Sequence, residues 1–68
     1  MMHWQRVYKD NREHRATIVR DVLMDREIDA VVVNKKDSPY GFGFLEVQVP
    51  ADQVILALKI IEEEIQFE

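Results

Sequence analysis

Residues 34–49, N-K-K-D-S-P-Y-G-F-G-F-L-E-V-Q-V, place a polar, turn-forming loop between two segments that have the character of strands. Before the loop, residues 28–33 (I-D-A-V-V-V) are rich in β-branched side chains, which is typical of a strand buried on both faces or nearly so. After it, residues 44–49 alternate, so that Leu45, Val47 and Val49 share one face of a strand that Pro50 ends. This stretch decides the fold, because it predicts an antiparallel strand pair joined by a long loop.

Helices are predicted on both sides of this strand pair. Residues 11–27 gather their apolar side chains on one helical face, and Asp10 with Glu13 three positions later resembles a capping box at the helix start. Residues 51–67 also have one apolar face, and Asp52 lies in the first turn, where the helix dipole favours a negative charge. The apolar face of this second helix is predicted to consist of Val54, Ala57, Leu58, Ile61 and Ile65. Residues 3–9 (H-W-Q-R-V-Y-K) complete the set as a first strand.

The predicted order is therefore strand, helix, strand, strand, helix (β-α-β-β-α) in one domain, residues 1–68. A right-handed crossover through the first helix makes the first two strands parallel, and both helices pack on one face of a three-stranded sheet. This is an α+β two-layer sandwich of ferredoxin-like type without a clear fourth strand. The predicted core consists of Val19, Leu23, Ala30, Val32, Leu45, Val47, Leu58 and Ile61.

Size and composition restrict the function. A chain of 68 residues buries only about 60% of its unfolded surface, so its core is thin. The absence of cysteine excludes disulfides and thiolate chemistry and favours a reducing compartment. No apolar run approaches the roughly 20 residues that span a bilayer, and the first residues lack the apolar region of a signal peptide, so we expect a soluble cytoplasmic protein with no membrane contact. The net charge of −4 disfavours nucleic acid as a partner.

The sequence also resembles a known family. The segment N-K-K-D-S-x-Y followed by F-G, a closing E-V-x-V-P strand and helix, and a preceding I-x-A-V-V-V, is similar to a small bacterial domain family of unknown function described as prokaryotic signal-transducing proteins. The resemblance extends from about Val7 to Ile61 and implies a PII-like fold as a minimal domain. It implies no established activity. Because the chain is much shorter than the PII regulators, their ATP binding and trimer are not implied.

The loop of residues 34–43 is the candidate ligand or partner site. Lys35, Lys36 and Ser38 are suited to an anionic ligand, together with backbone N–H groups near Gly41 and Gly43. The full candidate set is Asn34, Lys35, Lys36, Asp37, Ser38 and Tyr40. The alternative is a long hairpin turn, in which the polar side chains bond the local backbone and Pro39 and the glycines set the turn geometry.

No residue pattern predicts catalysis, a metal or a cofactor. His3 and His14 lack the spacing of a metal site, and Ser38 has no nearby histidine to activate it. The G-F-G of residues 41–43 is neither a Walker loop nor a dinucleotide fingerprint. We therefore do not expect an enzyme.

Surplus apolar side chains predict self-association as a homodimer. Alternation along the first strand is expected to put Trp4, Arg6 and Tyr8 with Phe44 on the sheet face away from the helices. The candidate self-association residues are Trp4, Tyr8, Phe44, Leu56, Ile60 and Phe67. The predicted function is a small regulatory or protein-interaction module in signal transduction, and the alternative is a sensor that binds a small anionic metabolite or nucleotide at the loop.

Overall fold

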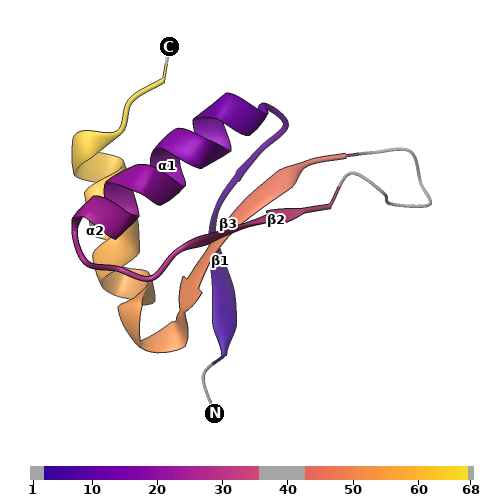
Figure 1. Ribbon diagram of the computed structural model, residues 1–68. Coiled ribbons are helices and arrows are strands. Elements are labelled where there is room, and N and C mark those ends of the chain that lie inside the picture. The colour runs from indigo at the N-terminus through magenta and orange to yellow at the C-terminus, as the bar shows by residue number, and fades with distance from the viewer. Residues whose placement is uncertain (1–2, 36–42, 68) are drawn as a thin grey trace.

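The computed structural model describes residues 3–35 and 43–67, which form one layer of strands and one layer of helices (Figure 1). The strands are β1 (Trp4–Asp10), β2 (Val31–Asn34) and β3 (Leu45–Pro50). The helices are α1 (Glu13–Asp25) and α2 (Val54–Glu64), and a 3-10 turn, η1 (Ala51–Gln53), precedes α2. The extents are 36 × 33 × 15 Å, the shape of two stacked layers. The predicted α+β class with three strands and two helices is confirmed.

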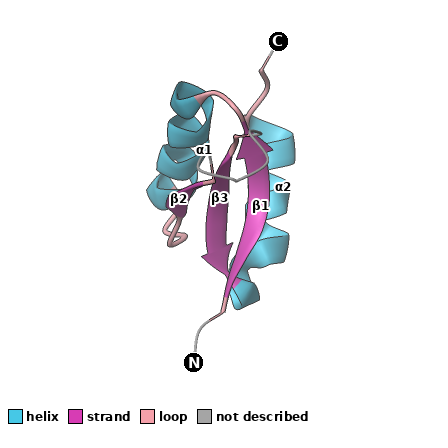
Figure 2. Ribbon diagram, turned by 90° about the vertical axis from the view of Figure 1, so that its right-hand side faces the viewer, coloured by secondary structure: helices cyan, strands magenta, loops and turns pink. Residues whose placement is uncertain are grey.

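β3 is the central strand, in the order β1-β3-β2. Both neighbours run antiparallel to it, so β1 and β2 point the same way and α1 crosses over between them. Figure 2 shows the strands in front and both helices behind, so in the described part of the chain one face of the sheet carries no helix. Neither helix in the described part of the chain is long and apolar enough to cross a membrane.

A β-bulge at Val7 interrupts β1. Arg6 lies opposite Gln48 and Tyr8 lies opposite Val47, so Val7 has no partner in the ladder. An extra residue reverses the faces to which the following side chains point. Tyr8 consequently points to the helix side, as Val47 does, and both Val7 and Tyr8 pack against the core. The expected grouping of Tyr8 with Trp4 on the other face is wrong for this reason.

α1 ends in a Schellman motif. Glu27 has a positive φ of 65°, and its N–H donates to the Met24 carbonyl while the Ile28 N–H donates to the Leu23 carbonyl, both at 3.0 Å. Leu23 and Ile28 are both buried, which supplies the apolar contact that accompanies this motif. The turn directs the chain from the helix into β2.

The core lies between the sheet and the helices. Its buried residues are Ala16, Val19, Leu23, Ile28, Ala30, Leu45, Val47, Val49, Ala57 and Ile60. Five of the eight predicted core residues are among them, and Val32 and Ile61 are partly buried against them. Leu58 is the exception, because 46% of it is exposed.

The predicted core face of α2 is wrong. Ile60, expected on the free side of the helix, is 7% exposed and packs in the core with Ala57. Almost every position in V-I-L-A-L-K-I-I is apolar, so the 3.6-residue spacing of apolar side chains does not identify which face of α2 is buried. Ala57 is fully buried in the core with Ile60, and an ion pair of Arg26 with Glu64 links the C-terminal ends of the two helices.

Candidate functional site: the helix-free face of the sheet

The helix-free face of the sheet brings together polar, charged and apolar side chains from all three strands. Residues directly opposite each other in an antiparallel pair point to the same face. The helix-free face therefore carries Trp4, Arg6 and Lys9 of β1, Glu46 and Gln48 of β3, and Val31 and Val33 of β2. By the same alternation, Phe44 and Lys35 follow at the loop end, where the Lys35 N–H donates to the Phe44 carbonyl at 2.8 Å.

Glu46 is the centre of this face. It is 8% exposed, although no helix covers it. Its Oε2 pairs with Arg6 Nη1 at 3.2 Å, and its Oε1 accepts a hydrogen bond from Gln48 Nε2 at 3.0 Å. Both carboxylate oxygens are therefore satisfied, which lowers the cost of burying the charge. Arg6 remains half-exposed, so part of its guanidinium is available to a visiting molecule.

The loop end of the face is basic. Lys9 Nζ lies 5.0 Å from the centroid of the Phe44 ring, a cation–π contact. Arg6, Lys9 and Lys35 give this face three positive charges against the one negative charge of Glu46. The net charge of the chain is −4, so the acidic excess lies elsewhere on the molecule. The opposite end of the face is apolar, with Trp4 41% exposed and Val31 39% exposed.

The helix side of β1 ends in a second cluster, in which Asp10 is the acceptor. Tyr8 Oη donates to Asp10 Oδ2 at 2.6 Å, and the Arg12 N–H donates to Asp10 Oδ1 at 2.9 Å. Desolvation, with the hydrogen bond to Asp10, raises the pKa of Tyr8 to about 12. The same hydrogen bond holds the pKa of Asp10 below its usual range. Asp10 is the last residue of β1 and makes no N-cap hydrogen bond to α1, which corrects the predicted capping box.

This second cluster also accounts for Phe67. Its ring centroid lies 6.2 Å from that of Tyr8, and the Arg15 guanidinium lies 5.0 Å from it. Tyr8, Phe67 and Ile60 are therefore packed within the fold and do not form a free surface, contrary to the self-association prediction. Among the predicted residues, Trp4 and Leu56 are exposed and Phe44 is half-buried.

The loop residues are only partly placed. Asn34 ends β2 and points to the helix side, as its partner Leu45 does, whereas Lys35 follows at the loop end of the helix-free face; both residues are exposed. Lys36, Asp37, Ser38 and Tyr40 lie outside the described residues. His3 and His14 are exposed, and no cluster of metal-binding side chains occurs in residues 3–35 and 43–67.

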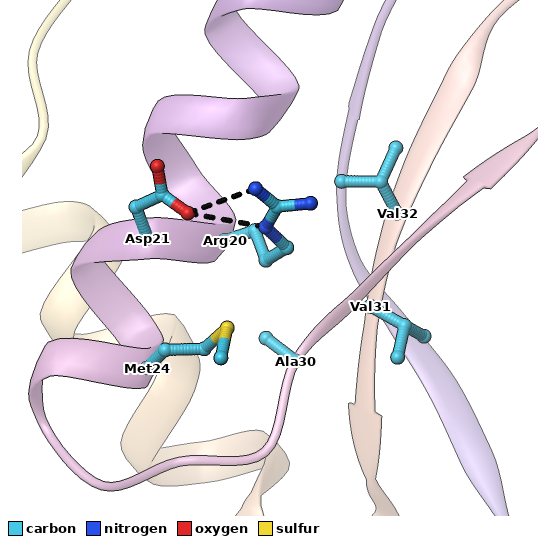
Figure 3. Close-up of a pocket in the computed structure, with 6 residues that line it drawn as sticks. All are labelled: Arg20, Asp21, Met24, Ala30, Val31 and Val32. Atoms are coloured by element: carbon cyan, nitrogen blue, oxygen red, sulfur yellow. Dashed lines mark hydrogen bonds and ion pairs between the residues drawn. The ribbon is translucent and has the colours of Figure 1, made fainter.

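Two further surfaces are present, and of their residues the sequence singled out only Leu56 as a surface candidate. The first turns of α2 expose Ile55, Leu56 and Leu58. An open groove of ≈ 490 Å³ lies between α1 and β2 (Figure 3). Its lining residues are Arg20, Asp21, Met24, Ala30, Val31 and Val32. In the sequence, nothing distinguishes Arg20 and Asp21 from an ordinary solvated helix face. Only the position of β2 under α1 makes them part of a groove.

Comparisons of the chain with protein-family models, with curated proteins and with solved structures found no match. The resemblance to prokaryotic signal-transducing domains stays a prediction, and the function is argued from the site.

Proposed function

We propose that this chain is a small protein-interaction module of regulatory type, which binds an acidic and partly apolar segment of another protein on the helix-free face of its sheet. The observation that carries this proposal is the charge of that face: Arg6, Lys9 and Lys35 surround a single paired Glu46 on a chain of net charge −4. A local basic surface on an acidic molecule attracts acidic partners and orients them.

The arrangement of the face also suits a peptide. Trp4 offers an apolar contact at one end, and Val31 and the half-exposed Arg6, both opposite Gln48, lie between it and the basic end. Tryptophan and arginine are the residues that most often dominate binding energy at protein interfaces. Binding of a peptide to an open sheet face needs no enclosed pocket, and no catalysis is part of the proposal.

The fold assignment belongs to the same proposal. A β1-β3-β2 order with antiparallel neighbours and a crossover helix supports a ferredoxin-like arrangement that ends before a fourth strand. Such an arrangement is compatible with a PII-like signal-transducing domain that acts in the cytoplasm.

A selection from a random peptide library tests the proposal. We expect the selected peptides to be rich in Asp, Glu and apolar residues. The double variant Trp4→Ala with Lys9→Gln should weaken their binding at least about tenfold, equivalent to 1.4 kcal/mol. The matched control is Leu56→Ala with Lys59→Gln, which removes one exposed apolar side chain and one cation from α2 and should leave Kd unchanged.

Three results would overturn the proposal. They are the selection of basic peptides, equal binding to both double variants, and tighter binding of single-stranded RNA than of any selected peptide.

One observation favours a second function, a sensor for a small anion. Lys9 and Lys35 both lie next to Phe44 at the loop end of the face, and two cations are suited to a phosphate or carboxylate. In that case nucleotides or sugar phosphates should raise the melting temperature of the wild type, and Lys35→Gln should abolish the shift.

A further inference from the structure

The outer edge of β2 has backbone groups that no strand in the described part of the chain pairs. Residues of an antiparallel strand direct their N–H and C=O groups alternately to its two sides. The Lys35 N–H donates toward β3, so the backbone N–H and C=O groups of Val33 and Val31 also point toward β3. The backbone N–H and C=O of Val32 therefore point outward, away from β3. Among the described residues, no hydrogen bond reaches the N–H or C=O of Val32.

This edge lacks most of the devices that keep strand edges from pairing. Natural proteins protect exposed edges with short strands, bulges, charges or proline, and β2 has only the first of these. The other edge of the sheet has such devices, namely the bulge at Val7 and the charged Lys9 and Asp10. β2 is a short, unbulged V-V-V run without a charged residue.

The groove beside this edge supplies a wall for a partner. Figure 3 shows Arg20 and Met24 of α1 directed toward Ala30 and Val32 across the groove. Met24 is 55% exposed, so an apolar side chain is available to a partner there. Arg20 Nε and Nη2 both donate to Asp21 Oδ1, at 3.1 and 3.0 Å, and this ion pair lies at the solvent side of the groove.

We propose that a second copy of this chain occupies the edge, with β2 paired antiparallel to β2 of the other copy about a twofold axis through Val32. The two Val32 residues exchange a pair of N–H···O=C hydrogen bonds, and Met24 and Val31 of each copy gain apolar contacts beside them. The result is a continuous six-stranded sheet, in which both helix-free faces lie on the same side.

Charge complementarity identifies the occupant as a second copy. A twofold interface places each surface against itself, so it is favourable only where the surface is self-complementary. The groove has one cation and one anion side by side beside Val32. An antiparallel copy brings Arg20 of one chain toward Asp21 of the other, so both charges are attracted. An acidic or a basic peptide is attracted by one of these two residues and repelled by the other.

Val32→Pro tests the edge directly. Proline at position 32 removes only the outward N–H, because the ladder to β3 uses Val31 and Val33. Sedimentation equilibrium should show a concentration-dependent dimer for the wild type, and Val32→Pro should weaken it by about tenfold or more through two lost hydrogen bonds. If this variant does not fold, Asp21→Arg replaces it. Asp21→Arg should weaken the dimer, adding Arg20→Asp should restore it, and Asp25→Arg, outside the groove on the same helix, should leave it intact.

Disulfide formation then reports the register. The chain contains no cysteine, so Val32→Cys introduces a single thiol in each copy. If Val32 of one copy pairs with Val32 of the other, the distance between their two Cα atoms falls within the 4.4–6.8 Å range for a disulfide. We expect Val32→Cys to cross-link faster than Ile55→Cys on α2. A monomeric wild type, a dimer that survives both Val32→Pro and Asp21→Arg, or faster cross-linking at Ile55 would overturn the proposal. Trp4→Ala with Lys9→Gln should leave the dimer intact, so a failure of the proposed binding function is distinguishable from a failure here.

Discussion

Replacing Ile60 by alanine should destabilise the protein far more than replacing Leu58 by alanine. Ile60 is 7% exposed in the core between α2 and the sheet, whereas Leu58 is 46% exposed on the same helix. The two variants delete the same number of carbon atoms from positions two residues apart. Both variants place alanine in the same helix, so the difference between their free energies of unfolding reports mainly the difference in burial.

The magnitude follows from the burial. Ile60→Ala removes three buried carbon atoms, worth about 0.8 kcal/mol each, and leaves a cavity, so its cost should be about 2–4 kcal/mol. Leu58→Ala removes atoms that are partly in water and leaves no closed cavity, so its cost should be about 1 kcal/mol or less. A domain of this size has about 3–10 kcal/mol of total stability, so Ile60→Ala should approach global unfolding.

Urea unfolding followed by the fluorescence of Trp4, with circular dichroism as a second probe, measures both variants. If Ile60→Ala is too unstable to measure, Ile60→Val should still cost about 0.5–1.5 kcal/mol. Equal losses for Leu58→Ala and Ile60→Ala, or a larger loss for Leu58→Ala, would refute the orientation of α2.

Two other features give predictions of their own. Glu27 occupies a left-handed conformation that costs a non-glycine residue about 1 kcal/mol, so Glu27→Gly should raise the melting temperature by about 4–8 °C in differential scanning calorimetry, and an unchanged or lower value would contradict the Schellman assignment. The lowered pKa of Asp10 predicts a stability contribution that is present above the ordinary aspartate pKa of about 4 and is lost as the pH falls through the lower folded value. The raised pKa of Tyr8 predicts a contribution that is full below the ordinary tyrosine pKa of about 10 and is lost as the pH rises through about 12. Tyr8→Phe should lower the free energy of unfolding near neutral pH by about 1 kcal/mol and flatten both limbs of its pH profile, and a profile identical to that of the wild type would exclude the Tyr8–Asp10 hydrogen bond as their cause.

The elements with one strong periodic signal were predictable from the sequence. The alternation of Leu45, Val47 and Val49 correctly predicts the buried face of β3, and the 3.6-residue spacing of Ala16, Val19, Val22 and Leu23 correctly predicts the core face of α1, in which Val22 is only partly buried. α2 was not predictable in this way, because its apolar positions cover most of its circumference and tertiary packing selects the buried face.

The candidate site depended on a feature that the strand pattern does not reveal. Without the bulge at Val7, alternation puts Tyr8 beside Trp4 and Arg6 and sends Lys9 to the helix side. The bulge reverses both residues, so the helix-free face gains Lys9 and loses Tyr8. The basic character of that face therefore became visible only with the register of β1 against β3.

An NMR titration of the ¹⁵N-labelled chain with an acidic peptide from the library selection maps the binding surface residue by residue. We expect shift changes at the Trp4 indole, at the amides of Arg6, Lys9 and Gln48, and at Glu46 in the middle of the helix-free face. The amides of Ile55 and Leu58 on α2 should not respond. Changes confined to α2, or saturable binding without any change on the three strands, would contradict the claim that this face of the sheet is the binding surface.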